Sequence, residues 1–456
     1  MRVRNKVLAL ATVTVAALAG CGGGSGGGGG FLPVTPVPVQ PPAPAESKVT
    51  LTVTVAGNAA SPDASGNYTV APGRNITVMA SEAVEWSGSS TGDAVVTRHE
   101  ISTIPTAWAS RLANASKTQP GSYTLVARTA DGLSKPLKFV VAAGDYRSGD
   151  YKVFGADGSR QSLTVDFDQR TFTMTDSNGV EATGALGAED SGWFSVISDR
   201  VTGINTSVLR PFDDTILGAF PYAVPYANPV TYASYPLVAS RALVTTQASL
   251  DGTYNRFRVD ASPTGRDSRI GQVQISAGGT LMKQCTDNII YRVDECPPAS
   301  LVSSTVAADA ESGMWSLADT ATSTFQGRFA IARMGGENVY LSAGPSPSGS
   351  SQVFSIGLPE TPAYTGFKSS AGGSTRHTLD VSSATATDYS YAPLGSASAT
   401  QFALGGVGPS APYGMRVAGN GPDRYFFMRS ARLEAVVGSR GNANTQGFLH
   451  LGLILD

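Results

Sequence analysis

Residues 121–141 read GSYTLVARTADGLSKPLKFVV and contain two matching patterns on either side of an Asp-Gly pair. Apolar residues occupy every second position on both sides: Tyr123, Leu125, Ala127, Leu137, Phe139 and Val141. A period of two is typical of a β-strand with one buried face. Asp-Gly is a strong signal for the tight turn of a hairpin. The stretch therefore predicts two antiparallel strands joined by the turn at Asp131-Gly132.

The same alternation continues upstream to Lys48, with strands expected about every 10 residues. This spacing favours a β-sandwich over residues 48–143. Its last two strands resemble those of bacterial immunoglobulin-like domains, which implies an Ig-like sandwich of about 95 residues. The region contains no cysteine, so the core disulfide of antibody domains is absent.

From Gly144 onward, short alternating segments separated by turns rich in Gly, Ser, Asp and Pro predict a second and larger β body. A Gly-x-Tyr element occurs at Tyr151 and again at Tyr254, and each is followed by a tryptophan-containing strand, at Trp193 and Trp315. Lipocalin-like barrels open with a similar element. The fold class is therefore all-β: either two related units, 144–248 and 249–456, or one antiparallel barrel or sandwich over 144–456.

The first 20 residues have the organisation of a secretory signal peptide, with basic residues followed by an apolar run too short to span a bilayer. Leu18-Ala19-Gly20-Cys21 then resembles the lipobox of bacterial lipoproteins. That resemblance implies cleavage before Cys21 and lipidation of its thiol. Gly22 implies sorting to the outer membrane. The alternative is an ordinary cleaved signal with an incidental cysteine.

Residues 21–47 form a tether, GGGSGGGGG at 22–30 followed by a proline-rich segment. The first part is typical of a flexible coil and the second of a stiffer spacer. Similar tethers occur in surface-exposed receptor lipoproteins of Gram-negative bacteria, such as the transferrin-binding and factor-H-binding classes. The resemblance to those classes is limited to the tether and the β content, and it implies no particular ligand.

The remaining two cysteines, Cys285 and Cys296, form an even pair in a compartment that permits disulfides. We expect them to be bonded to each other. Two free thiols or a metal pair are the alternatives, although a metal site needs more ligands than two cysteines.

Charged residues make up only 15% of the chain, against ~25% in average soluble proteins, and the formal net charge is −2. The chain lacks the clustered basic excess that nucleic acid binding requires. The only histidines are His99, His377 and His450. Ser374, His377 and Asp380 are local, and on a strand His377 and Asp380 would point to opposite faces, which disfavours a catalytic triad. We expect no catalytic residues, no metal and no cofactor.

Residues 220–236 combine prolines with Tyr222, Tyr226, Tyr232 and Tyr235. Because proline cannot donate a ladder hydrogen bond, we interpret this segment as a long loop. Tyrosines on a restrained loop are typical of binding surfaces and suit sugar stacking, so these four are the candidate binding residues. Rings that cover the end of a barrel are the alternative.

The leading functional hypothesis is a non-catalytic, lipid-anchored outer-membrane protein that presents β domains for binding or adhesion. Its expected partners are the membrane, through the lipid on Cys21, and a protein or glycan ligand. A periplasm-facing structural or envelope-assembly lipoprotein is the first alternative. A hydrolase of envelope polysaccharide or ester is the second.

Overall fold

The computed structural model describes residues 48–91, 95–198, 200, 207–287, 289–310, 312–375, 379–420, 422–441 and 444–455. The expected signal peptide, Cys21 and the tether lie outside the described residues, as do His377 and the side chain of His99. The fold is all-β, and the helical elements among these residues are the short 3₁₀ segments η1 (Gln247–Leu250) and η2 (Pro298–Ser300). No helix of this part of the chain is long and apolar enough to span a bilayer.

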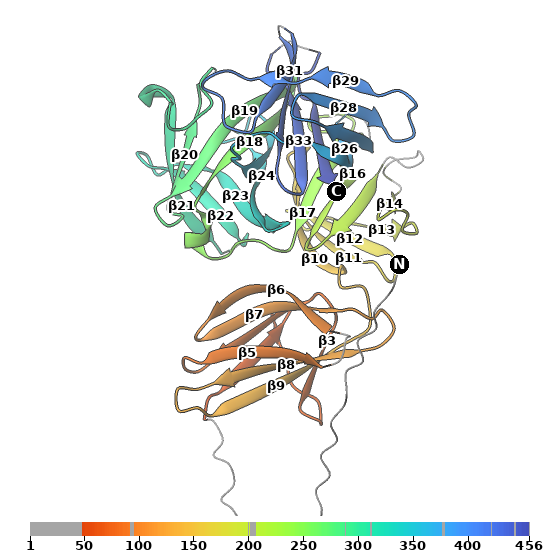
Figure 1. The fold of residues 1–456 in the computed structure, drawn as a ribbon, viewed down its shortest axis with the longest axis vertical. Coiled ribbons are helices and arrows are strands. Elements are labelled where there is room, and N and C mark those ends of the chain that lie inside the picture. The colour runs from red at the N-terminus through yellow and green to blue at the C-terminus, as the bar shows by residue number, and fades with distance from the viewer. Residues whose placement is uncertain are drawn as a thin grey trace, which may run out of the picture. The chain divides into compact units, whose positions relative to one another are not determined.

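The first β body is a sandwich of two sheets, drawn in red to orange in Figure 1, with strand orders β2-β1-β4-β7-β6 and β3-β9-β8-β5. The hairpin expected at 121–141 is formed by β8 and β9, with Leu125 opposite Leu137. Trp108 lies between the sheets, stacked on Tyr123 and Phe139 at ring distances of 6.0 and 6.3 Å. The strands of the sandwich are β1 (Leu51–Val55), β2 (Asn58–Ala59), β3 (Asn67–Val70), β4 (Asn75–Ala80), β5 (Glu85–Thr91), β6 (Val95–Ile104), β7 (Ala107–Asn114), β8 (Gly121–Arg128) and β9 (Ser134–Val141).

The second body, barrel A, is a closed eight-stranded antiparallel barrel in which β10 pairs with both β11 and β17. Its interior is filled by apolar side chains that include Phe172 and Phe220, whose rings meet edge to face at 5.6 Å. Its strands are β10 (Gly149–Gly155), β11 (Arg160–Asp166), β12 (Thr171–Asp176), β13 (Glu181–Leu186), β14 (Phe194–Ile197), β15 (Val208–Phe212), β16 (Thr215–Ala223) and β17 (Tyr232–Ser240).

The third body, barrel B, is a second closed eight-stranded barrel, with β18 pairing with both β19 and β25. One half of its interior is apolar and contains Trp315, Phe329 and Tyr340. Its strands are β18 (Gly252–Ser262), β19 (Gly265–Ser276), β20 (Leu281–Cys285), β21 (Leu301–Asp309), β22 (Met314–Asp319), β23 (Phe325–Met334), β24 (Glu337–Pro345) and β25 (Gln352–Pro359).

The fourth body, the C-terminal sheet, is nine-stranded and drawn in blue in Figure 1, with the order β29-β28-β27-β26-β34-β33-β32-β31-β30. It curls until β29 contacts β31, so it is nearly closed. The residues expected as one unit, 249–456, thus contain barrel B and this sheet. Its strands are β26 (Phe367–Ser374), β27 (Asp380–Ala384), β28 (Asp388–Pro393), β29 (Thr400–Ala403), β30 (Gly405–Gly406), β31 (Arg416–Asn420), β32 (Asp423–Arg429), β33 (Leu433–Gly438) and β34 (Leu449–Ile454).

One continuous hydrophobic core joins barrel A, barrel B and the C-terminal sheet. It includes Phe220 of barrel A, Phe257 and Phe354 of barrel B, and Leu451 of the C-terminal sheet, all at most 1% exposed. The outer surface of barrel B therefore contributes apolar side chains to a core that it shares with its neighbours. Because these apolar side chains face outward, the residues that alternate with them along the same strands point into barrel B.

Candidate functional site

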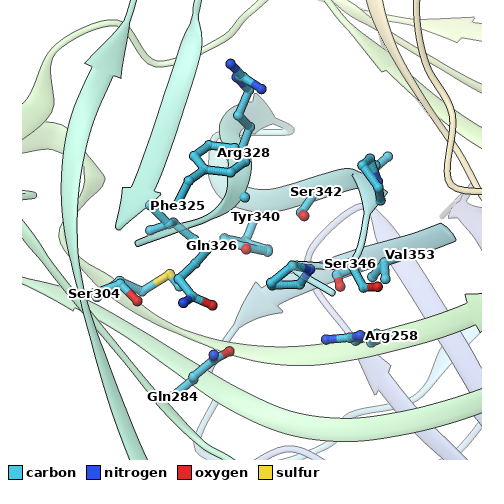
Figure 2. Close-up of a pocket in the computed structure, with 18 of the residues that line it drawn as sticks. Arg258, Gln284, Ser304, Phe325, Gln326, Arg328, Tyr340, Ser342, Ser346 and Val353 are labelled. Atoms are coloured by element: carbon cyan, nitrogen blue, oxygen red, sulfur yellow. The ribbon is translucent and has the colours of Figure 1, made fainter. Parts of the chain in front are cut away.

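A cavity of about 130 Å³ lies next to the apolar interior of barrel B, and Met282, Leu317 and Tyr340 belong to both (Figure 2). We call it the arginine cavity, because four arginines line it: Arg160, Arg256, Arg258 and Arg328. Gln284, Ser304, Tyr340 and Ser342 contribute polar groups from four other strand positions, and Figure 2 shows them around the opening. No Asp or Glu is among the described residues that line it.

The alternation of β18 explains why charged residues point into this barrel. Phe257 and Val259 face outward and join the core shared with the other β bodies. Because successive side chains on a strand point to opposite faces, Arg256 and Arg258 must face inward. The sequence NRFRVD at 255–260 carries this alternation. Sequence reasoning missed these arginines because alternation does not reveal which face lies inside.

The four arginines differ in how their charge is balanced. Arg258 lies 2.5 Å from Asp260, which also contacts Arg269 at 3.2 Å. Arg328 pairs with Asp309. Arg160 and Arg256 form no ion pair with any carboxylate among the residues that the structure describes.

Arg256 is held in place by a hydrogen bond and not by an ion pair with a described carboxylate. Its Nη1 donates a hydrogen bond to Gln284 Oε1 at 2.8 Å. Desolvation inside the barrel lowers the pKa of Arg256, and it also lowers the pKa of Arg160, where the nearby Arg328 adds to the effect. A lowered pKa means that the surroundings disfavour the positive charge, and an anion beside these guanidinium groups would offset that cost by pairing with them.

A second cavity of about 550 Å³ adjoins the first and shares Arg256, Arg258 and Gln284 with it. Arg269, Arg424 and Arg440 extend the positive lining, and Asp287 is the acidic residue among the described residues there. Cys285 also lines this space. The disulfide therefore lies next to Gln284, the residue that positions Arg256.

The predicted disulfide is confirmed. Cys285 and Cys296 are joined by a bond of 2.01 Å. The two cysteines are 11 positions apart in the sequence, and Cys285 is the last residue of β20. Among the described residues, no group of three or more His, Cys, Asp or Glu side chains is arranged to hold a metal ion.

The prediction that residues 220–236 form one long loop is wrong. Residues 215–223 and 232–240 are strands β16 and β17, paired in one hairpin with Pro221 opposite Ser234. The pairing of β16 with β15 ends at Ala219, and that of β17 with β10 ends at Leu237. Pro221 thus lies where the hairpin projects past its neighbours, and Pro225 and Pro229 lie in the connection between β16 and β17, so no second strand there needs their N–H. Pro236 lies at the end of the β17–β10 pairing, where its carbonyl oxygen accepts from the backbone N–H of Ala156 at 2.8 Å.

The four candidate tyrosines are consequently separated. Tyr235 is buried, with the Arg266 guanidinium 4.2 Å from its ring centroid. Tyr226 is 45% exposed. Tyr222 and Tyr232 both line a different cavity at one end of barrel A, although Tyr222 is only 1% exposed.

No family model matches the sequence, and no curated protein is significantly similar to it. A solved structure to which the chain shows similarity is a DUF4784 family protein from Bacteroides caccae. The two are 10% identical with a TM-score of 0.16, over 77% of this chain and 95% of that one.

Proposed function

We propose that the protein is a non-catalytic binding protein whose arginine cavity captures an anionic group, a carboxylate, sulfate or phosphate. The observation that supports this is the balance of charge around the arginine cavity. Four arginines line one cavity without a lining carboxylate, and two of them lack an ion pair among the described residues. Guanidinium groups bind planar oxyanions with paired, charge-assisted hydrogen bonds.

The barrel architecture supports the same proposal. Eight-stranded barrels have an interior that is either filled by side chains or able to hold one small ligand. Barrel B is filled at one end by Trp315, Phe329 and their neighbours. Its other end is lined by convergent polar groups, which is typical of a site that orients a ligand.

The proposed location is the outer membrane, with the chain anchored through lipid on Cys21. The supporting observations are the lipobox-like Leu18-Ala19-Gly20-Cys21 and the tether at 21–47. In this proposal the Ig-like sandwich adds to the spacer that separates the barrels from the membrane. More than one acyl chain on Cys21 would make the anchor stable.

Titration of the full chain with sodium sulfate, phosphate and acetate, at constant ionic strength in chloride, tests the binding proposal. We expect saturable binding by calorimetry. Arg256→Gln and Arg160→Gln should each weaken it about tenfold or more, because each removes a charged hydrogen-bond donor. Arg128→Gln, at an exposed arginine of the sandwich, is the matched control. The absence of saturable binding, or an equal loss in the control, contradicts the proposal.

A further inference from the structure

A separate cavity of about 440 Å³ lies at one end of barrel A, and we call it the tyrosine cavity. Its lining differs in chemistry from that of the arginine cavity. Besides the guanidinium groups of Arg160 and Arg200, it has two phenol rings, an amide and two carboxylates, contributed by Asp157, Gln161, Asp176, Tyr222 and Tyr232. Gln161 and Asp176 face each other across the β11–β12 ladder.

Two buried polar atoms in this lining have no hydrogen-bond partner among the described residues. They are the hydroxyl oxygen of Tyr222 and the amide oxygen Oε1 of Gln161. Burial raises the pKa of Tyr222 well above 10, so its oxygen carries a proton and can donate. Unsatisfied buried polar groups are rare in folded proteins because each costs free energy. A ligand with hydroxyl groups would satisfy both the donor and the acceptor.

The carboxylate of Asp157 adds an acceptor and shapes the selectivity of the cavity. Its Oδ1 accepts hydrogen bonds from the backbone N–H of Ser159 at 3.1 Å and from its hydroxyl at 2.8 Å. Burial raises the pKa of Asp157 to about 6, so it is mainly ionised at neutral pH. Arg160 and Arg200 also line the cavity and offset the charges of Asp157 and Asp176, so the lining as a whole is close to neutral. The two carboxylates can therefore accept hydrogen bonds from the hydroxyls of a neutral ligand.

Tyr232 supplies an accessible aromatic surface at the same cavity. The residue is 41% exposed, and the Arg200 guanidinium lies 5.3 Å from its ring centroid. Aromatic rings beside convergent polar groups offer an apolar surface together with oriented hydrogen bonds. A sugar ring presents the complementary combination, C–H groups on its faces and hydroxyls on its rim.

The tyrosine cavity and the arginine cavity adjoin each other. Arg160, Gly344 and Pro345 line both. At this junction a Cβ atom added to Gly158 would lie only 2.6 Å from the Cβ of Gln352. A Cβ added to Gly344 would lie 3.6 Å from Nε of Arg160. The β10–β11 turn of barrel A therefore packs directly against β24 and β25 of barrel B.

We propose that a single acidic oligosaccharide occupies both cavities. A neutral sugar unit lies in the tyrosine cavity, where Tyr222 donates to and Gln161 and Asp157 accept from its hydroxyls. The carboxylate or sulfate of a neighbouring unit lies among Arg160, Arg256 and Arg258. This inference rests on the proposed anion binding and names the class of ligand that would be bound. The lining of one cavity suits an anionic group, and the lining of the adjoining cavity suits hydroxyl groups.

Hyaluronan oligosaccharides of two, four and six units, in which acidic and neutral sugars alternate, are suitable probes. Chitin oligosaccharides of the same lengths are the neutral controls, and free glucuronate is the single-unit control. We expect the full chain to bind a hyaluronan oligosaccharide that reaches both cavities at least about tenfold more tightly than glucuronate, because the second set of contacts becomes intramolecular. Chitin oligosaccharides of equal length should bind more weakly.

Tyr222→Phe removes only the unpartnered hydroxyl, so the variant should fold normally. It should weaken oligosaccharide binding about fivefold, the effect of one lost hydrogen bond, and leave glucuronate binding unchanged. Tyr226→Phe, at an exposed tyrosine of the same hairpin that does not line the cavity, is the matched control. If glucuronate binds but length and Tyr222→Phe have no effect, this inference is wrong and the proposed function stands. If neither glucuronate nor sulfate binds, the proposed function fails as well.

Discussion

Nε2 of His450 lies 3.1 Å from Oε1 of Glu434 in the C-terminal sheet, and neither side chain is more than 1% exposed. On the other side of the imidazole, Nδ1 is 3.7 Å from Oδ2 of Asp380, which is also fully buried. Tyr391 packs edge-on against the ring at 5.6 Å. Burial by itself would lower the pKa of His450, but the two carboxylates outweigh it and raise that pKa to about 9.

This arrangement predicts that the free energy of unfolding falls as the pH rises from about 6.5 to 9. The imidazolium is stabilised in the folded state, so its contribution is complete below the unfolded pKa of ~6.5 and is lost through the folded pKa. The difference between the two pKa values corresponds to about 3 kcal/mol. Urea denaturation of the full chain at several pH values measures it.

His450→Gln is the matched variant for this experiment, because it keeps a polar side chain but cannot titrate. Its unfolding free energy should depend less on pH across that interval than that of the unmodified chain. Identical pH profiles for the two chains would show that His450 is not the titrating group.

Asp214 is the centre of a second buried ionic cluster, which it forms with Arg111 and Arg241. It lies between Arg241, with Nε 2.7 Å from Oδ1, and Arg111, with Nη1 3.6 Å from Oδ2. All three side chains are at most 4% exposed. Because Asp214→Asn would leave two buried guanidinium groups without their carboxylate, we expect a loss of about 3–5 kcal/mol in unfolding free energy.

The exposed pair Arg74–Asp150, at 2.6 Å, provides the comparison for Asp214. Asp150 is 59% exposed, so Asp150→Asn should change the unfolding free energy by less than about 1 kcal/mol. Urea denaturation of both variants under the same conditions checks the contrast. Equal losses would show that burial does not determine the strength of these pairs.

The sequence allowed the local elements of the fold to be predicted. The alternation around Asp131-Gly132 corresponds to the β8–β9 hairpin. The two Gly-x-Tyr elements occupy equivalent places, since each tyrosine lies in the first strand of a closed barrel. Tyr151 donates to the carbonyl oxygen of Arg147 at 2.6 Å, and Tyr254 to that of Leu250 at 3.2 Å, four residues earlier in both cases.

The candidate site could not be predicted in the same way, because it depends on which strands pair and which surfaces they cover. Arg160 and Arg328 come from strands of different barrels, 168 positions apart. Glu434 and His450 meet because β33 and β34 are neighbours, a pairing that alternation alone does not specify. In an isolated barrel, the apolar residues of NRFRVD (255–260) would be expected to face the interior. Because barrel B packs against apolar neighbours, Phe257 and Val259 face outward, and the arginines face inward.

The disulfide should stabilise the wall of the adjoining cavity. For a loop of this length the chain-entropy estimate is about 3 kcal/mol. We therefore expect a reductant to lower the urea midpoint of the full chain. The double variant Cys285→Ser/Cys296→Ser should start at the lower midpoint and be insensitive to reductant. A midpoint that reductant does not change in the unmodified chain would contradict a stabilising role.

The corrected position of the tyrosines predicts unequal effects of substitution by serine. Tyr235→Ser removes a buried ring from barrel A and should cost about 3–5 kcal/mol of unfolding free energy. Tyr226→Ser, at an exposed position between β16 and β17, should change it by no more than about 0.5 kcal/mol. Thermal unfolding of the two variants in parallel distinguishes this outcome from the equal, small effects that a common loop would produce.

Asp309 should limit the affinity of the arginine cavity for an anion, because its carboxylate pairs with Arg328 and neutralises part of the positive charge of the lining. It lies outside the lining itself, and it also favours the charged form of Arg160 through its negative charge. Asp309→Asn keeps the shape of the side chain and an oxygen that accepts from Arg328, but removes the negative charge. We expect sulfate to bind about two- to tenfold more tightly to this variant, with a smaller gain at high salt.

Asp319→Asn, at an acidic residue of β22 outside the lining of both basic cavities, is the control and should leave the affinity for sulfate unchanged. Weaker sulfate binding by Asp309→Asn would instead show that Asp309 acts by holding Arg328 in its binding position.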